Sequence, residues 1–272
     1  MKLPFLALGL VAALQLAACR GSISPGDDGR TDALGGGSRF AINIDPANEA
    51  AWAQSSPARL AGEGFHGVRF VSRASIQPKI DELKAQGLLV MAVITSESAG
   101  YVPWNADYLQ IGNEPDDGNT YLSPAKYADE WVLYRNTYPQ LAGRFVFAAL
   151  DSGGQNAVSY ASDALSAVGD RAPWPDMIDL HPYAKTTGEA AGDFDEMWNA
   201  FGIPVIATEW HNEDDTWSFQ CMLGNREWGR STYWNSAFAY TDAMVPGFGL
   251  RDAEGAPKPF YYSLLSAPSD CR

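Results

Sequence analysis

Short apolar runs alternate with longer stretches of helical character from residue 40 onward. The runs carry apolar residues at neighbouring positions, a pattern typical of parallel strands buried on both faces. We expect strands at residues 40–44, 67–71, 88–94, 108–111, 145–150, 177–180, 204–208 and 244–250. We expect helices at residues 75–86, 123–138, 157–168, 194–200 and 228–243. Strands that alternate with helices predict an α/β fold in which helices cover a parallel sheet.

The number of these units narrows the fold class. Eight strand–helix units within residues 39–272 fit a single (β/α)₈ TIM barrel, whose usual size is about 250 residues. A doubly wound open sheet is the alternative. No GxGxxG or P-loop motif follows any expected strand, which counts against that alternative.

The first residues predict export. Lys2 and the apolar run at 3–16 are typical of a signal peptide, and the run is too short for a transmembrane anchor. Residues 16–19 resemble a bacterial lipobox, in which Cys19 becomes the lipid-modified first residue. Ordinary secretion is the alternative, so we expect either a lipid-anchored protein of the bacterial envelope or a secreted one. The predicted segments are a signal peptide at 1–18, a Gly/Ser/Asp-rich tether at 19–38 and a folded domain at 39–272.

Two cysteines, Cys221 and Cys271, remain after Cys19. An exported chain meets an oxidising environment, so we expect these two to form a disulfide. Two free buried thiols are the alternative.

Composition and charge exclude several classes. Hydrophobic residues make up 46% of the chain and aromatic residues 12%, which excludes a disordered protein. The chain carries 33 acidic and 19 basic residues, a formal net charge of -14. Nucleic acid and anionic lipid surfaces are therefore disfavoured as partners, and so are polyanionic glycans. We expect a monomer that needs no cofactor.

Polar residues stand where the expected strands end. Glu114 follows the fourth strand within the motif Asn113-Glu114-Pro115, and Glu209 follows the seventh strand. Side chains at the carboxyl ends of barrel strands meet on one face, so two carboxylates are expected across one pocket. Paired carboxylates are the machinery of glycoside cleavage.

The Asn-Glu-Pro motif after strand four, with the Glu after strand seven, resembles the retaining glycoside hydrolases of clan A. Among compact members, residues 40–267 resemble the small glycosyl hydrolase catalytic-core group, which includes endo-β-1,3-glucanases. The resemblance implies that Glu114 is the general acid/base and Glu209 the nucleophile. It also implies that Asn113 binds the sugar 2-hydroxyl and Arg69 lies beside the nucleophile. His181 and Tyr183 match the polar or aromatic positions after strand six. The expected activity is retaining, preferably internal, cleavage of a β-linked glucan.

Aromatic residues near the strand ends are candidate sugar platforms, because flat rings suit the C–H faces of pyranoses. We name Trp104, Trp210 and Trp217 for this role.

Two other functions stay open. A carbohydrate-binding envelope lipoprotein without catalysis would use the same barrel, although both Glu residues are present. A metal-dependent hydrolase could use His181, His211 and the acidic run 213–215, but no HxH pair follows the first strand. That run is expected to be a solvated loop, with calcium binding as its alternative.

Overall fold

A computed structural model describes residues 40–151, 154–183, 186–210, 236–237 and 239–266. The chain divides into two units, Met1–Gly35 and Gly36–Arg272, and all described residues belong to the second. Several predictions concern residues outside these ranges: the signal peptide and tether with Cys19, and also Trp217, Cys221, Cys271, His211 and the acidic run 213–215. Among the described helices, none has both the length and the apolar character needed to cross a bilayer.

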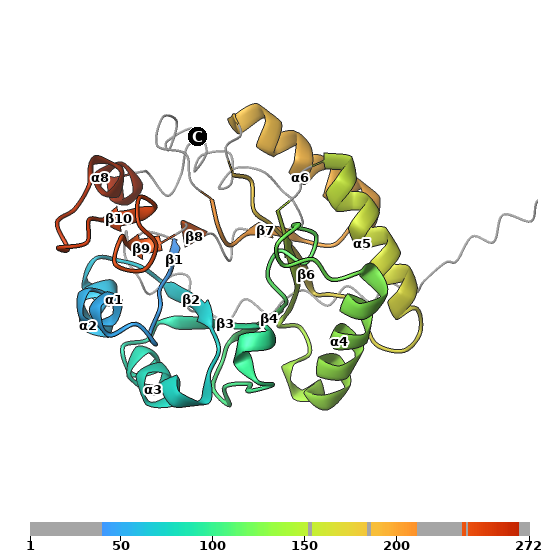
Figure 1. Cartoon of the computed structure of the whole chain (residues 1–272), viewed down its shortest axis with the longest axis horizontal. Coiled ribbons are helices and arrows are strands. Elements are labelled where there is room, and N and C mark those ends of the chain that lie inside the picture. The colour runs from blue at the N-terminus through green and yellow to red at the C-terminus, as the bar shows by residue number, and fades with distance from the viewer. Residues whose placement is uncertain (1–39, 152–153, 184–185, 211–235, 238, 267–272) are drawn as a thin grey trace, which may run out of the picture. The chain divides into compact units, whose positions relative to one another are not determined.

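A curled parallel sheet forms the centre of the described domain (Figure 1). Its order is β7-β6-β5-β4-β3-β2-β1-β8, and every neighbouring pair is parallel. The first seven strands are β1 (Ala41–Asn43), β2 (Gly67–Val71), β3 (Leu89–Ile94), β4 (Tyr108–Ile111), β5 (Phe145–Leu150), β6 (Met177–Leu180) and β7 (Val205–Ala207). All seven lie within the ranges predicted from the apolar runs, which confirms the α/β class.

Helices lie on the outer side of the curled sheet (Figure 1). They are α1 (Glu49–Gln54), α2 (Pro57–Gly62), α3 (Gln77–Ala85), α4 (Pro124–Thr137), α5 (Gly154–Val168), α6 (Thr187–Phe201) and α8 (Pro259–Ser266). The sequence predicts α3, α4, α5 and, in part, α6, but not α1, α2 or α8. Helix α4 begins as expected, because the Ser123 side chain accepts a hydrogen bond from the Lys126 N–H and Pro124 occupies the first turn.

Two apolar clusters lie on opposite faces of the sheet. The larger one packs strands against the outer helices, as where Trp131 of α4 meets Phe145 and Phe147 edge-on. The smaller one lies inside the curve and joins Ala41, Met91, Val146 and Ile206. These four side chains come from β1, β3, β5 and β7. A layer of four from alternate strands is how the centre of a TIM barrel is filled.

The end of the domain differs from the prediction. The expected strand at 244–250 contains Pro246 and Gly247, and Gly247 has a φ of 88°, so a turn interrupts it. The strand beside β1 is instead β8 (Ser236–Ala237), inside the segment where a helix was expected. Strand β9 (Ala239–Thr241) pairs with β10 (Gly249–Arg251) in a separate two-stranded sheet. The prediction of a helix at 228–243 is therefore wrong over its described part. The prediction of the eighth strand at 244–250 is also wrong. No pairing between β7 and β8 is recorded among the described residues.

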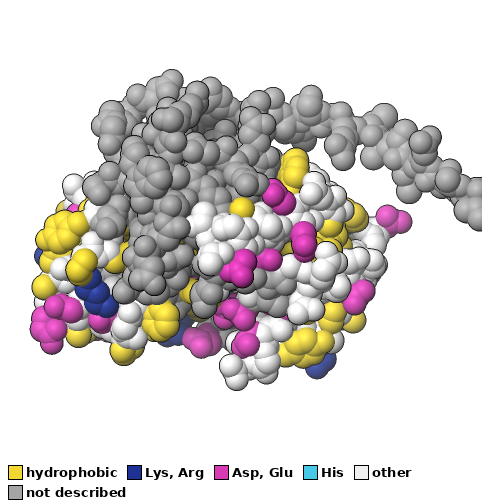
Figure 2. Space-filling view, turned by 90° about the horizontal axis from the view of Figure 1, so that it is seen from above, with side chains coloured by type: hydrophobic (Ala, Val, Ile, Leu, Met, Phe, Trp, Pro, Cys, Tyr) yellow, Lys and Arg dark blue, Asp and Glu magenta, His cyan; other side chains and the backbone are white. Residues whose placement is uncertain are grey.

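Acidic side chains outnumber basic ones on the described surface seen in Figure 2. This agrees with the excess of acidic residues in the sequence.

Candidate functional site

A polar layer covers the interior apolar cluster at the carboxyl ends of the strands. Arg69 of β2, Gln110 of β4 and Asp179 of β6 are its members, and all are buried. Each is the third residue of its strand and lies on the inward side, between outward-facing apolar neighbours. Buried polar groups need hydrogen-bond partners, so this layer is the foundation on which the site is built.

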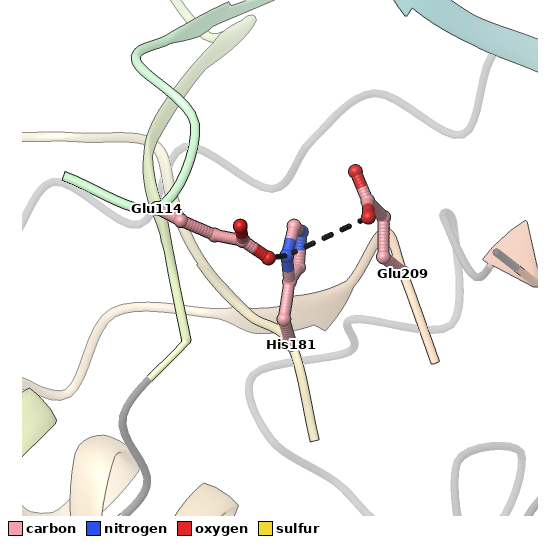
Figure 3. Close-up of side chains that lie close together, drawn as sticks. All are labelled: Glu114, His181 and Glu209. Atoms are coloured by element: carbon pink, nitrogen blue, oxygen red, sulfur yellow. Dashed lines mark hydrogen bonds and ion pairs between the residues drawn. The ribbon is translucent and has the colours of Figure 1, made fainter. Parts of the chain in front are cut away.

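Two carboxylates and one imidazole meet above this layer. Glu114 follows β4, His181 follows β6 and Glu209 follows β7. One ligand atom from each lies within 4.8 Å of the others, and Figure 3 shows His181 between the two carboxylates. Glu209 is only 8% exposed, whereas Glu114 is half-buried. The structure thus brings together the two Glu residues and the His that the sequence singles out.

Arg69 connects Glu209 to the residues around it. Its guanidinium donates to Glu209 Oε1 and to Asn113 Oδ1. It also donates to Asn43 Oδ1 at 2.9 Å and to Gln110 Oε1 at 2.8 Å. A planar fork of donors suits this role, because one side chain holds four acceptors in fixed directions.

Glu209 lies in a setting that keeps it ionised. Burial alone would raise the pKa of its carboxyl, but the charges of His181 and Arg69 and the hydrogen bonds from Tyr183 and Arg69 outweigh burial and lower it. The Tyr183 hydroxyl donates to Glu209 Oε2. Burial, followed by the neighbouring Glu209 charge, raises the pKa of Tyr183, so this hydroxyl stays a donor.

The surroundings of His181 favour its protonated form. Its Nδ1 lies 2.7 Å from Glu114 Oε1, and its Nε2 lies 3.1 Å from Thr208 Oγ1 and 3.6 Å from Asp179 Oδ2. Burial opposes the charge, but the Glu209 charge, the nearby Asp179 carboxylate and the hydrogen bond to Glu114 raise the pKa of His181 to about 10. The Thr208 hydroxyl donates to Asp179, and its oxygen accepts from Nε2–H.

A metal ion fits this group poorly. Glu114, His181 and Glu209 offer three ligand atoms at suitable spacing. A histidine ligand needs a free ring nitrogen, however, and both nitrogens of His181 are engaged, Nδ1 with Glu114 at 2.7 Å and Nε2 with Thr208 at 3.1 Å. The chemistry of the donor set favours an acid–base site.

The structure describes two of the three predicted aromatic platforms, Trp210 and Trp104. Trp210 is fully buried and packs edge-to-face against Phe260 of α8 at 5.9 Å, so no ring face is left for a sugar, and its predicted stacking role is corrected to packing. Trp104 is 76% exposed on the connection from β3 to β4. Its neighbour Asn105 hydrogen-bonds Asp81 on α3, which places this stretch beside an outer helix. Among the described residues, no contact joins Trp104 to the carboxylates.

Sequence reasoning missed the supporting residues Gln110, Asp179 and Thr208. Asp179 accepts from the Thr208 N–H at 2.9 Å and so fixes the residue that precedes Glu209. A signal was present, since one polar residue stands at the same place in otherwise apolar strands. Inward and outward faces alternate along a strand, so that place marks the barrel interior.

Comparisons with known proteins define the fold. No protein-family model matches the chain, and no curated protein matches it. Several solved structures do match the chain. A GH128 subgroup V exo-β-1,3-glucanase from Cryptococcus neoformans matches with a TM-score of 0.64 and 18% identity, over 85% of this chain and 99% of that one. The fold of this chain is similar to that of the GH128 β-1,3-glucanase structures.

Two further GH128 structures show the same likeness. A subgroup VI exo-β-1,3-glucanase from Aureobasidium namibiae matches with a TM-score of 0.64 and 16% identity, over 84% of this chain and 96% of that one. The third match is a subgroup I endo-β-1,3-glucanase from Amycolatopsis mediterranei, crystallised as a mutant with laminaripentaose. It has a TM-score of 0.62 and 19% identity, over 84% of this chain and 99% of that one. These GH128 likenesses confirm the resemblance inferred from the Asn-Glu-Pro motif at the level of the fold.

Proposed function

We propose that this protein is a glycoside hydrolase that cleaves β-1,3-linked glucan with retention of configuration. The observation that carries the proposal is the pair Glu114 and Glu209, whose nearest oxygens lie within 4.8 Å across His181. Carboxyl groups about 5 to 5.5 Å apart are typical of retaining enzymes, whereas inverting enzymes leave room for a water between them. The GH128 structural neighbours support β-1,3-glucan as the substrate class.

The surroundings of the two carboxylates support different roles. Glu209 is ionised, buried and held by Arg69 and Tyr183, as a nucleophile aimed at an anomeric carbon must be. Glu114 is the more exposed carboxylate, and in the proposal it protonates the departing oxygen and then deprotonates a water. The site separates these roles through environment, because Arg69 pairs with Glu209, whereas His181 Nδ1 lies 2.7 Å from Glu114 and 3.9 Å from Glu209.

The contact with His181 fixes which oxygen of Glu114 can act as the acid. Because His181 donates to Glu114 Oε1, the other carboxyl oxygen is the one that would carry the proton in the proposed starting state.

Asn113 is placed to bind the substrate beside the nucleophile. Its Oδ1 accepts from Arg69, so its amide NH₂ is the group it can offer to a sugar 2-hydroxyl. A contact at the 2-hydroxyl that strengthens in the transition state would add several kcal/mol of stabilisation.

The test is hydrolysis of laminarihexaose and of a dinitrophenyl β-glycoside by the wild type and by single variants. Glu209→Gln should abolish turnover of both substrates. Glu114→Gln should abolish turnover of laminarihexaose but spare the first step with the activated glycoside, and azide should restore its second step. Glu82→Gln, an exposed Glu on α3, is the matched control and should behave as the wild type. Near-normal activity of Glu209→Gln would refute the assignment. Product sizing in the same assay tests the proposed internal cleavage.

Four further parts of the proposal rest on the sequence or on the interior layer of the sheet. The sheet is proposed to close as a complete eight-stranded barrel, which the interior layer from alternate strands supports. Cys19 is proposed as the lipid-modified residue of an envelope protein, and Cys221 with Cys271 as a disulfide. The protein is proposed to act as a monomer.

A further inference from the structure

Three residues near the carboxyl ends of β4 and β5 have an unusual backbone. Glu114, Ala148 and Ala149 have φ values of 48°, 62° and 104°, a region that residues with a Cβ rarely adopt. The pairing of β5 with β6 shifts register between Ala148 and Leu150. Strained backbone persists only where its surroundings hold it, and it gathers at functional sites. One of the strained residues is the proposed acid/base itself.

Two buried side chains hold the strained backbone of Ala148. Its N–H donates to the Tyr127 hydroxyl at 2.7 Å, and its carbonyl accepts from Gln110 Nε2 at 3.0 Å. The Tyr127 hydroxyl in turn donates to the Ile111 carbonyl at 2.7 Å, and Gln110 Nε2 also donates to the Gly112 carbonyl at 2.9 Å. Both side chains therefore tie β5 to the end of β4.

The strained segment reaches Glu114 through one further bond. The Ala149 carbonyl accepts the Glu114 N–H at 2.9 Å. The Tyr127 ring also lies close to the turn before Glu114, since a Cβ on Gly112 would come within 2.9 Å of it. The position of the Glu114 backbone thus depends on β5 keeping its strained path.

We propose that Tyr127 is a positioning residue that holds Glu114 through Ala148 and Ala149. Tyr127 lies on α4, is fully buried on the outer side of the sheet and touches no reacting group. Its hydroxyl stabilises a backbone path that would otherwise relax, and the Ala149 carbonyl then fixes where the acid/base carboxylate stands. This inference rests on the proposed role of Glu114. The competing view is that Tyr127 only packs, as its edge-on contact with Phe147 at 4.7 Å would allow.

The variant that separates these views is Tyr127→Phe, which keeps the ring and removes the hydroxyl. We expect kcat on laminarihexaose to fall by about 10- to 100-fold with little change in KM, because a small displacement of a catalytic group costs rate and not binding. The first step with a dinitrophenyl glycoside should fall much less, since that leaving group needs little protonation. Tyr160→Phe is the matched control, because it removes a buried hydroxyl that donates to the Leu122 carbonyl. It should change kcat less than twofold.

A rescue experiment tests the strain directly. Glycine adopts positive φ without strain. Adding Ala148→Gly and Ala149→Gly to Tyr127→Phe should therefore raise kcat at least fivefold above that of Tyr127→Phe alone. Equal losses on both substrates with no glycine rescue, or an unchanged kcat in Tyr127→Phe, would overturn the proposal.

Amide hydrogen exchange tests the link between Tyr127 and Glu114 without relying on the proposed activity. The Glu114 N–H should exchange at least tenfold faster in Tyr127→Phe than in the wild type or Tyr160→Phe, whatever the enzyme cleaves. Unchanged exchange would overturn the positional link. Failure of the proposed function would appear instead as wild-type activity in Glu114→Gln.

Discussion

The charge on His181 should have a measurable effect on the free energy of unfolding. Burial opposes the charge on His181, but the Glu209 charge, the nearby Asp179 carboxylate and the hydrogen bond to Glu114 outweigh it and raise the pKa of His181 from 6.5 to about 10 in the folded chain. A difference of about 3.5 units, at 1.36 kcal/mol each, corresponds to about 5 kcal/mol of folding free energy. Since the folded-state pKa is the higher one, this stabilisation is fully present below pH 6.5 and is lost as the pH rises toward 10.

The perturbation is His181→Gln, which cannot take up the proton. Urea unfolding of the wild type and the variant from pH 6 to pH 10 gives the difference in unfolding free energy at each pH. That difference should shrink by up to about 5 kcal/mol over the range, since the wild type alone loses the linked proton. Asp179→Asn removes one of the carboxylates behind His181 and should move the loss to lower pH. A difference that stays constant from pH 6 to pH 10 would refute the view that His181 is a buried imidazolium.

Other predictions concern Arg69 and the cysteines. The lysine of Arg69→Lys cannot hold four acceptors, so kcat on laminarihexaose should fall by about 10- to 100-fold, in line with the loss of hydrogen bonds to charged groups. A change below threefold would contradict the role of Arg69 beside Glu209. Cys19→Ser should release the protein from the membrane fraction or leave the leader uncut, whereas a wild type without lipid by mass spectrometry would favour ordinary secretion. Cys221 and Cys271 should resist alkylation without reductant, and the disulfide should stabilise the fold by about 3 to 4 kcal/mol. Two labelled thiols in exported protein would disprove that pairing.

The seven central strands could be predicted from the sequence because both faces of each are buried. Apolar runs such as Phe145–Leu150 are typical of parallel strands that are buried on both faces. The end of the sheet could not be predicted, because β8 has only two residues and carries no apolar run of its own. The apolar stretch at 244–250 was more conspicuous, although Pro246 and Gly247 make a turn within it.

Some residues of the candidate site could likewise be predicted from the sequence, and others could not. Glu114 and Glu209 could be found because they leave the ends of strands, where chain order alone places them on one face. The roles of Asp179 and Gln110 depend on partners far along the chain, such as Thr208 and Ala148, which only the folded structure brings near. Trp210 shows the reverse case, because the position after Glu209 suggested a sugar platform while packing against α8 hides the ring.

The most direct test of the central claim is the stereochemistry of the first product. Proton NMR can follow the anomeric signals of laminarihexaose cleavage by the wild type before mutarotation mixes them. Nucleophilic attack by Glu209, followed by water activated by Glu114, inverts the anomeric centre twice, so the new reducing end should appear first as the β-anomer. If the α-anomer appears first, water attacks directly and the two carboxylates do not act as nucleophile and acid/base.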